Sequence, residues 1–131
     1  MLALLACNSK QAPVSAVDKP EAPAFRVDVA PPATCARAMP CEAQLRLTAL
    51  DGFKVNAEYP FKFVGDVGPA ISFDGTGTFA PGDKTTGTLT IKFRSEAAGT
   101  IKVSGTFKLS VCTEEVCKIE QPKISFDVPV T

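Results

Sequence analysis

Four cysteines in two closely spaced pairs are the side chains of this sequence best suited to covalent chemistry. Cys112 and Cys117 flank a short acidic turn, and Cys35 and Cys41 enclose five residues. Such a pair can form a disulfide that stabilises a fold permanently or exchanges with the thiols of another protein. Four cysteines allow three pairings, of which the local one is the simplest. Two interpretations are open. In the first, Cys112–Cys117 is a redox pair and Cys35–Cys41 is a structural bridge. In the second, both pairs are structural bridges.

Charged neighbours of the hairpin pair act on its thiols in opposite directions. Glu114 and Glu115 lie between the two cysteines and would raise a thiol pKa, whereas Lys118 follows Cys117 and would lower it. A thiol whose pKa is near neutral or raised attacks well but leaves poorly. The local sequence therefore does not decide whether the pair is reactive.

A metal site is a weaker interpretation of the same cysteines. Structural zinc sites usually place two to four residues between the ligands of a pair, whereas the gaps are five and four here. Thiolates with Met39 nearby could hold Cu(I), an equally weak interpretation. We therefore expect no metal and no other cofactor.

Composition excludes several other functions. The chain of 131 residues has no histidine, which excludes His-based catalytic triads and His metal ligands. Its 14 basic and 14 acidic residues cancel, so no net field attracts nucleic acid. A content of 45% hydrophobic and 21% charged residues is typical of a chain with a packed core.

The fifth cysteine, Cys7, suggests a membrane anchor. It follows Leu4-Leu5-Ala6, which resembles a bacterial lipobox, the motif whose cysteine is lipidated. Residues 1–7 are too short for a complete signal sequence and predict a partial one. Residues 8–24 are rich in Ala and Pro and predict a disordered, flexible linker. We therefore expect a lipoprotein of the bacterial cell envelope that faces the periplasm, at the outer rather than the inner membrane; an ordinary N-terminus with one stray cysteine is the alternative.

Residues 25–131 show the alternation of apolar and polar side chains that is typical of half-buried strands. The clearest runs are residues 43–49, 89–93 and 101–111, with shorter runs and turn residues between them. No helical pattern of useful length occurs. We predict an all-β domain, an immunoglobulin-like antiparallel β-sandwich of about seven to nine strands. The predicted core contains six large side chains: Phe61, Leu89, Ile91, Phe107, Leu109 and Phe126.

Two registers are possible for the hairpin that carries Cys112 and Cys117. If Val111 lies opposite Cys117, Leu109 meets Ile119 and the apolar faces agree. If the two cysteines lie opposite each other, the apolar faces disagree. We predict the first register, with Cys112 in the turn. A bulge or strand break is expected at Pro122, which cannot donate a ladder hydrogen bond.

Two stretches resemble one family, the N-terminal periplasmic domain of the transmembrane disulfide reductase DsbD. Asp51-Gly52-Phe53-Lys54-Val55-Asn56 is similar to the family's Gly-aromatic-His-Val-Asn segment, with Lys54 in place of histidine. Val111 to Cys117, followed by Pro122 and a closing strand, is similar to its paired-cysteine hairpin. The family places five residues between these cysteines, and this chain has four.

The resemblance implies an immunoglobulin-like sandwich that exchanges electrons with thioredoxin-like periplasmic proteins through Cys112 and Cys117. A non-catalytic lipoprotein domain is the alternative, in which both pairs are structural disulfides and a sheet edge or loop binds another protein. A hydrolase is not indicated. The oligomeric state does not follow from the sequence.

Overall fold

The structure is a computed structural model that describes residues 23–131. The predictions for Cys7, for residues 1–7 and for residues 8–22 of the linker lie outside the described residues. In the described part, no helix could span a membrane. Ala24, predicted as the end of the linker, is buried, and its carbonyl accepts a hydrogen bond from the N–H of Leu50 at 2.8 Å. The packed domain therefore begins at least one residue before its predicted start.

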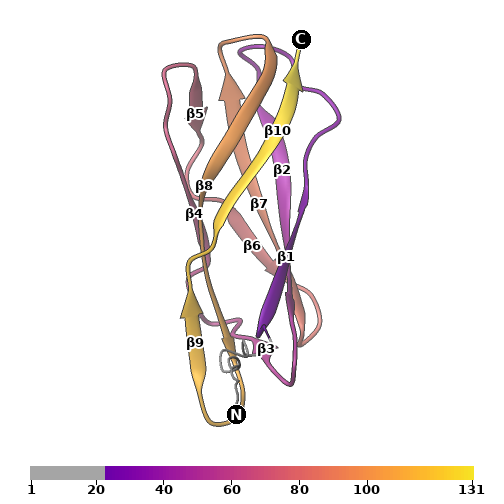
Figure 1. Cartoon of the computed structure of the whole chain (residues 1–131), viewed down its shortest axis with the longest axis vertical. Helices are drawn as coiled ribbons and strands as arrows, with labels where there is room; N and C mark the ends of the chain where they lie inside the picture. Colours follow the sequence, from indigo (N-terminus) through magenta and orange to yellow (C-terminus); the bar gives the residue numbers. More distant parts are fainter. Residues whose placement is uncertain (1–22) are drawn as a thin grey trace, which may run out of the picture.

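The strands form two antiparallel sheets (Figure 1). The first has the order β1-β2-β7, and two short strands pair with different parts of the free edge of β7. Its members are β1 (Phe25–Ala30), β2 (Cys41–Ala49), β5 (Ile71–Phe73), β6 (Thr78–Pro81) and β7 (Thr86–Ser95).

The second sheet is organised around one long strand, β8, which has short partners along both edges. β10 and β9 pair with successive parts of one edge, and β4 and β3 with successive parts of the other. Its members are β3 (Lys54–Val55), β4 (Lys62–Gly65), β8 (Gly99–Cys112), β9 (Cys117–Glu120) and β10 (Lys123–Val130).

This strand order is that of an immunoglobulin-like sandwich. β1-β2-β7 with β5 and β6 corresponds to the ABED sheet, and β3 and β4 with β8 and β10 to the CFG sheet. The predicted fold class is thus confirmed. The described residues form ten strands, more than predicted, because three edge positions each hold two strands instead of one.

The core lies between the sheets, where alternate residues of each strand point inward. Five of the six predicted core residues are at most 9% exposed, and Phe107, Leu109 and Leu89 are completely buried. Phe126 is only half-buried, and its ring meets that of Phe93 edge-on at 6.4 Å. The strict alternation of the long strands therefore predicted most of the core.

Strand β6 was not predicted from the sequence. Residues 75–82 contain three glycines and a proline and were predicted as turns. Phe79 in this strand nevertheless stacks on Phe61, with ring centroids 3.9 Å apart and planes at 10°. Gly87 on β7 provides the space, because a Cβ there would collide with the Phe79 ring. Val64 and Gly65, also predicted as loop, belong to β4.

Candidate functional site

The four cysteines of the described part form two disulfides, Cys35–Cys41 and Cys112–Cys117. This is the local pairing of the three that were possible. The two disulfides lie toward opposite ends of β8. Cys112 is the last residue of β8. Gly99, its first residue, pairs with Val130, and the backbone of Val130 pairs in turn with that of Cys35. In residues 23–131 no three potential metal-ligating side chains come together.

The Cys35–Cys41 bridge joins the two sheets. Cys41 is the first residue of β2 in the first sheet. Cys35 lies beside β10 of the second sheet, where its N–H donates to the Pro129 carbonyl at 2.9 Å and its own carbonyl accepts from the N–H of Thr131 at 2.8 Å. Both cysteines are buried, at 6% and 9% exposure. An incoming thiol would have little access to these sulfurs.

The Cys112–Cys117 bridge closes the hairpin of β8 and β9, and the predicted register of this hairpin is wrong. The two cysteines are directly opposed, with Cα atoms 4.0 Å apart. Val111 pairs with Lys118, and Ser110 pairs with Ile119. Ile119, predicted to face the core, therefore points outward and is 61% exposed.

The turn explains this register. The N–H of Thr113 donates to the Val116 carbonyl at 2.8 Å, so only Glu114 and Glu115 remain at the tip. The Thr113 hydroxyl oxygen also accepts hydrogen bonds from the N–H groups of Glu115 (3.2 Å) and Val116 (3.1 Å). A tight turn of this kind sets the pairing of the strands and overrides the apolar pattern.

The strand break at Pro122 is confirmed, but it involves no change of face. Glu120 pairs with Leu109 in β9, and Lys123 pairs with Thr106 in β10, so both strands follow one register along β8. The Pro122 carbonyl accepts a hydrogen bond from the N–H of Phe107 at 3.0 Å. Only the predicted orientation of Ile119 had required an extra residue here.

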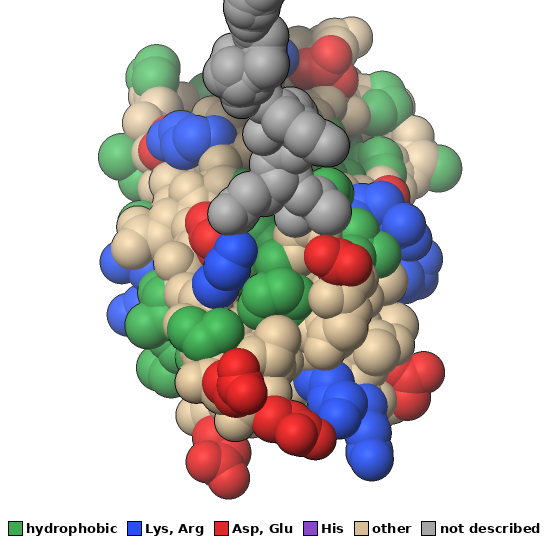
Figure 2. All heavy atoms as spheres, turned by 60° about the horizontal axis from the view of Figure 1, so that its bottom comes forward, with side chains coloured by type: hydrophobic (Ala, Val, Ile, Leu, Met, Phe, Trp, Pro, Cys, Tyr) green, Lys and Arg blue, Asp and Glu red, His purple; other side chains and the backbone are tan. Residues whose placement is uncertain are grey.

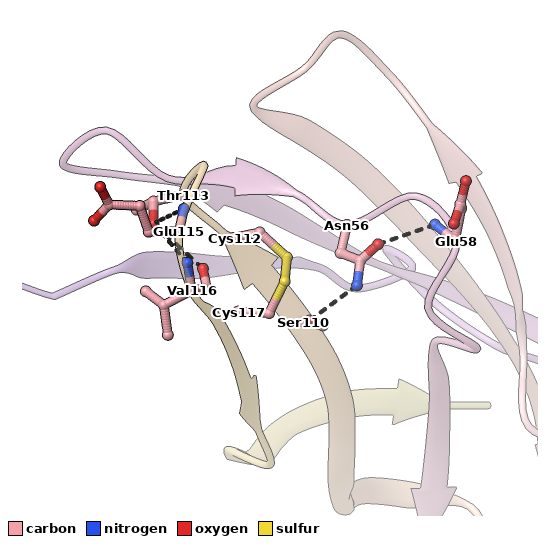
Figure 3. Close-up of a disulfide and its surroundings, with 8 residues drawn as sticks. All are labelled: Asn56, Glu58, Ser110, Cys112, Thr113, Glu115, Val116 and Cys117. Atoms are coloured by element: carbon pink, nitrogen blue, oxygen red, sulfur yellow. Dashed lines mark hydrogen bonds between the residues drawn. A yellow bond between two sulfur atoms is a disulfide. The ribbon is translucent and has the colours of Figure 1, made fainter.

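The disulfide lies on the outer face of the second sheet. Two neighbouring rows of side chains cross three strands there, and the disulfide belongs to the first row. Directly opposed residues of antiparallel strands point to the same side. The first row is therefore Lys54, Cys112 and Cys117, and the second is Asn56, Ser110 and Ile119. Figure 3 shows the two sulfurs on the side of the hairpin that faces Asn56.

An open hollow of about 480 Å³ lies next to Cys112. Its lining residues are Gly52, Lys54, Cys112, Thr113, Glu114 and Glu115. Gly52 belongs to the turn that leads into β3, where Asp51 and Gly52 both have positive φ (54° and 83°). Figure 2 views this end of the sandwich and shows hydrophobic, acidic and basic side chains side by side on the visible surface.

Cys117 is the more accessible of the two hairpin cysteines. It is exposed, whereas Cys112 is half-buried on the inner strand of the hairpin. Val116 (52% exposed) and Ile119 are exposed apolar side chains close to Cys117 along the chain. A partner thiol can therefore approach Cys117 across a partly apolar surface.

The lysine next to the sulfurs is not the one expected from the sequence. Lys118 is paired with the core residue Val111, so it points to the opposite side of the hairpin from the cysteines. Its ammonium lies 5.3 Å from the centre of the Phe53 ring, a cation–π arrangement. Lys54, which shares the outer face with Cys112, is the residue placed to influence the thiols.

No protein-family model matches this chain, and comparisons with curated proteins and with solved structures find no significant match. The two stretches that carry the resemblance to the DsbD N-terminal domain nevertheless lie side by side, because β3 pairs with the end of β8. The buried Ser110 beside the disulfide was not predicted, and its hydroxyl accepts a hydrogen bond from Asn56, 54 residues away in the sequence.

Proposed function

We propose that this protein is a thiol–disulfide exchange module whose reactive bond is Cys112–Cys117. The observation that supports the proposal is the difference in accessibility between the two bridges. Cys35 and Cys41 are buried and join the sheets, whereas Cys117 is exposed at the end of a hairpin. Exchange requires a thiolate to reach one sulfur in line with the other, and only the hairpin bridge offers this access.

The exchange consists of two steps that balance in atoms and electrons. A thiolate of a reduced dithiol partner attacks Sγ of Cys117, the Cys112–Cys117 bond breaks, and Cys112 leaves as a thiolate. The second thiolate of the partner then attacks the mixed disulfide and releases Cys117 as a thiolate. The partner ends as a disulfide and the hairpin as a dithiol, so two electrons have been transferred; the reverse sequence oxidises the partner's thiols.

The partner is proposed to be a thioredoxin-like periplasmic protein, in line with the sequence resemblance to the DsbD N-terminal domain. A module with two disulfides suits an oxidising compartment. The proposal includes lipidation of Cys7 and a periplasm-facing location, at the outer membrane in preference to the inner. When the chain is expressed with a complete signal sequence, it should fractionate with membranes, and Cys7→Ser should release it.

Redox titration of the full chain tests the exchange. The protein is equilibrated in glutathione and dithiothreitol buffers, alkylated under acid quench and mapped by mass spectrometry. We expect the hairpin pair to titrate at roughly −180 to −270 mV, the range of thioredoxin-like partners, and Cys35–Cys41 to titrate below about −300 mV. If both pairs resist reduction equally, exchange is excluded, and a binding domain with two structural bridges takes its place.

A further inference from the structure

We propose that Lys54 stabilises Cys112 as the leaving thiolate and thereby directs an attacking thiolate to Cys117. This inference rests on the proposed exchange function and adds a residue that decides which of the two sulfurs is attacked. Lys54 is a positioning residue in this scheme, because it forms and breaks no covalent bond.

The register brings Lys54 to Cys112. The two residues are directly opposed between β3 and β8, and the Cβ atoms of such pairs are about 4.5–5.5 Å apart and on the same face. A lysine side chain is long and flexible enough to bring its ammonium to a neighbouring sulfur. Among residues 23–131, Lys54 forms no ion pair, and it lines the same hollow as Cys112.

The backbone directly after Lys54 is held by hydrogen bonds to two different segments, which supports the opposition of Lys54 to Cys112. The N–H of Val55 donates to the Lys84 carbonyl at 2.8 Å, and the N–H of Asn56 donates to the Ser110 carbonyl at 3.1 Å. These bonds connect β3 to the β6–β7 turn and to β8 itself. Only the side chain of Lys54, which is exposed, has to move toward the sulfur.

The same geometry separates Lys54 from Cys117. Cys117 lies on β9, one strand beyond Cys112, and neighbouring strands are about 4.8 Å apart. The ammonium therefore acts more strongly on the Cys112 sulfur than on the Cys117 sulfur. In a disulfide the sulfur whose thiol has the lower pKa leaves faster, so attack is directed to Cys117, which is also the more exposed sulfur.

Several other charged side chains lie near the bridge or on neighbouring strands. Glu114 and Glu115 line the same hollow and oppose a thiolate. Asp51 precedes β3, and Asp83 and Lys84 line a second hollow with Lys54. On β9, Lys118 and Glu120 pair with the core residues Val111 and Leu109, so they point to the other face. Among residues 23–131, Lys54 is the only cation that lines the hollow next to Cys112.

The test measures thiol pKa values directly and needs no partner protein. All variants carry Cys7→Ser, and Cys117→Ala leaves Cys112 as the only free thiol beside the intact Cys35–Cys41 bridge. Its rate of alkylation by iodoacetamide is followed from pH 6 to 10. Adding Lys54→Gln should raise the Cys112 pKa by about 0.5–1, the effect of one exposed charge at this range, and Lys54→Arg should restore it.

Two controls make the result specific. Lys108→Gln removes a charge from the same face of β8 four residues away, about 13 Å along the strand, and should leave the Cys112 pKa unchanged. In the Cys112→Ala variant, Lys54→Gln should change the Cys117 pKa less than it changes that of Cys112. An unchanged Cys112 pKa in Lys54→Gln, or an equal change at both cysteines, would overturn the inference.

A second readout follows the direction of attack. The wild-type hairpin disulfide is exposed briefly to reduced glutathione, acid-quenched, and mapped for the glutathionylated cysteine. We expect the adduct mainly on Cys117, with a severalfold larger share on Cys112 in Lys54→Gln; an unchanged distribution contradicts the proposal. If the redox titration excludes exchange, the thiol pKa result still stands by itself, so the two failures can be told apart.

Discussion

Asn56 and Ser110 are joined by two hydrogen bonds immediately beside the Cys112–Cys117 disulfide. Nδ2 of Asn56 donates to the Ser110 hydroxyl oxygen at 3.3 Å, and the N–H of Asn56 donates to the Ser110 carbonyl at 3.1 Å. Ser110 is completely buried although it lies on the outer face of β8. Asn56 therefore satisfies a buried polar group and holds the chain beyond β3 against the strand that carries Cys112.

Replacing Asn56 should destabilise the domain through this hydroxyl. In Asn56→Ala the Ser110 hydroxyl loses its side-chain partner, which should lower the free energy of unfolding by about 1–3 kcal/mol. Urea unfolding with both disulfides intact measures the change. The double variant Asn56→Ala/Ser110→Ala should lose less than the sum of the two single variants, and strictly additive losses would mean that the bond contributes little.

Removing each disulfide should separate the two bridges by their effect on stability. Loop closure alone is worth about 2 kcal/mol for either short loop. The buried sulfurs of Cys35 and Cys41 also contribute packing between the sheets, so Cys35→Ala/Cys41→Ala should cost at least about 1 kcal/mol more than Cys112→Ala/Cys117→Ala. Urea unfolding of the two double variants provides the comparison. The reverse order would contradict the assignment of the buried bridge as the structural one.

The hairpin register can be checked by a pair of truncations. Phe107 is fully buried on β8, and Phe107→Ala should lower the free energy of unfolding by about 3–5 kcal/mol. Ile119→Ala removes an exposed side chain and should change it by less than about 0.5 kcal/mol. Truncation of a buried aliphatic side chain costs about 2 kcal/mol or more. A loss of that size in Ile119→Ala would support the register predicted from the apolar pattern.

The contact between β6 and β7 predicts a specific glycine requirement. In Gly87→Ala the new Cβ collides with the ring of Phe79, which would have to leave its stack on Phe61. Overpacking of this kind costs about 1–3 kcal/mol, measured as a lower midpoint in thermal unfolding. Gly68→Ala is the matched control, because its Cβ meets only Ile71 at an ordinary 3.6 Å. Equal effects of the two substitutions would argue against the position of β6.

Asp83 makes a small contribution to the stability of the fold, and this contribution is lost at low pH. Its pKa lies below the usual value because the carboxylate accepts hydrogen bonds from the Thr85 N–H and from the Thr86 and Thr85 hydroxyls. A lowered pKa in the folded state means stabilisation that is complete above the unfolded pKa, near 4. It is lost as the pH falls through the folded value. Carboxyl NMR titration should show this lowered pKa, and Thr85→Ala/Thr86→Ala should bring it back toward the usual value.

Much of the sandwich follows from residue patterns, because its long strands alternate strictly between inward apolar and outward polar side chains. β2, β7 and β8 were predicted in this way. The hairpin register was not predicted, because the apolar pattern makes Ile119 look like a core residue. The two-residue tip of Glu114 and Glu115 instead places the two cysteines directly opposite each other. Lys118 takes an inward position instead, beside Phe53 at the edge of the sandwich.

The cysteine pair of the candidate site was predictable from the sequence, but the side chains that surround it were not. The position of Lys54 depends on β3, a strand of two residues that pairs with a strand more than 50 residues later. No local pattern encodes such a pairing. Lys54 lies in one of the two stretches that resemble the DsbD N-terminal domain, and the register of β3 and β8 places it opposite Cys112.

The hydrogen bond from Leu50 to Ala24 has a consequence for how the domain would stand on a membrane. Ala24 lies beside the turn that lines the hollow next to Cys112, so the N-terminal segment joins the sandwich at its reactive end, while the C-terminus lies at the other (Figure 1). If Cys7 carries the proposed lipid, the tether would join the sandwich at this reactive end. The 17 residues from there to Ala24 span at most about 60 Å. Within this reach, a partner at the membrane surface could contact the hairpin, which lies at the same end of the sandwich as the tether, whereas the Cys35–Cys41 bridge lies at the opposite end.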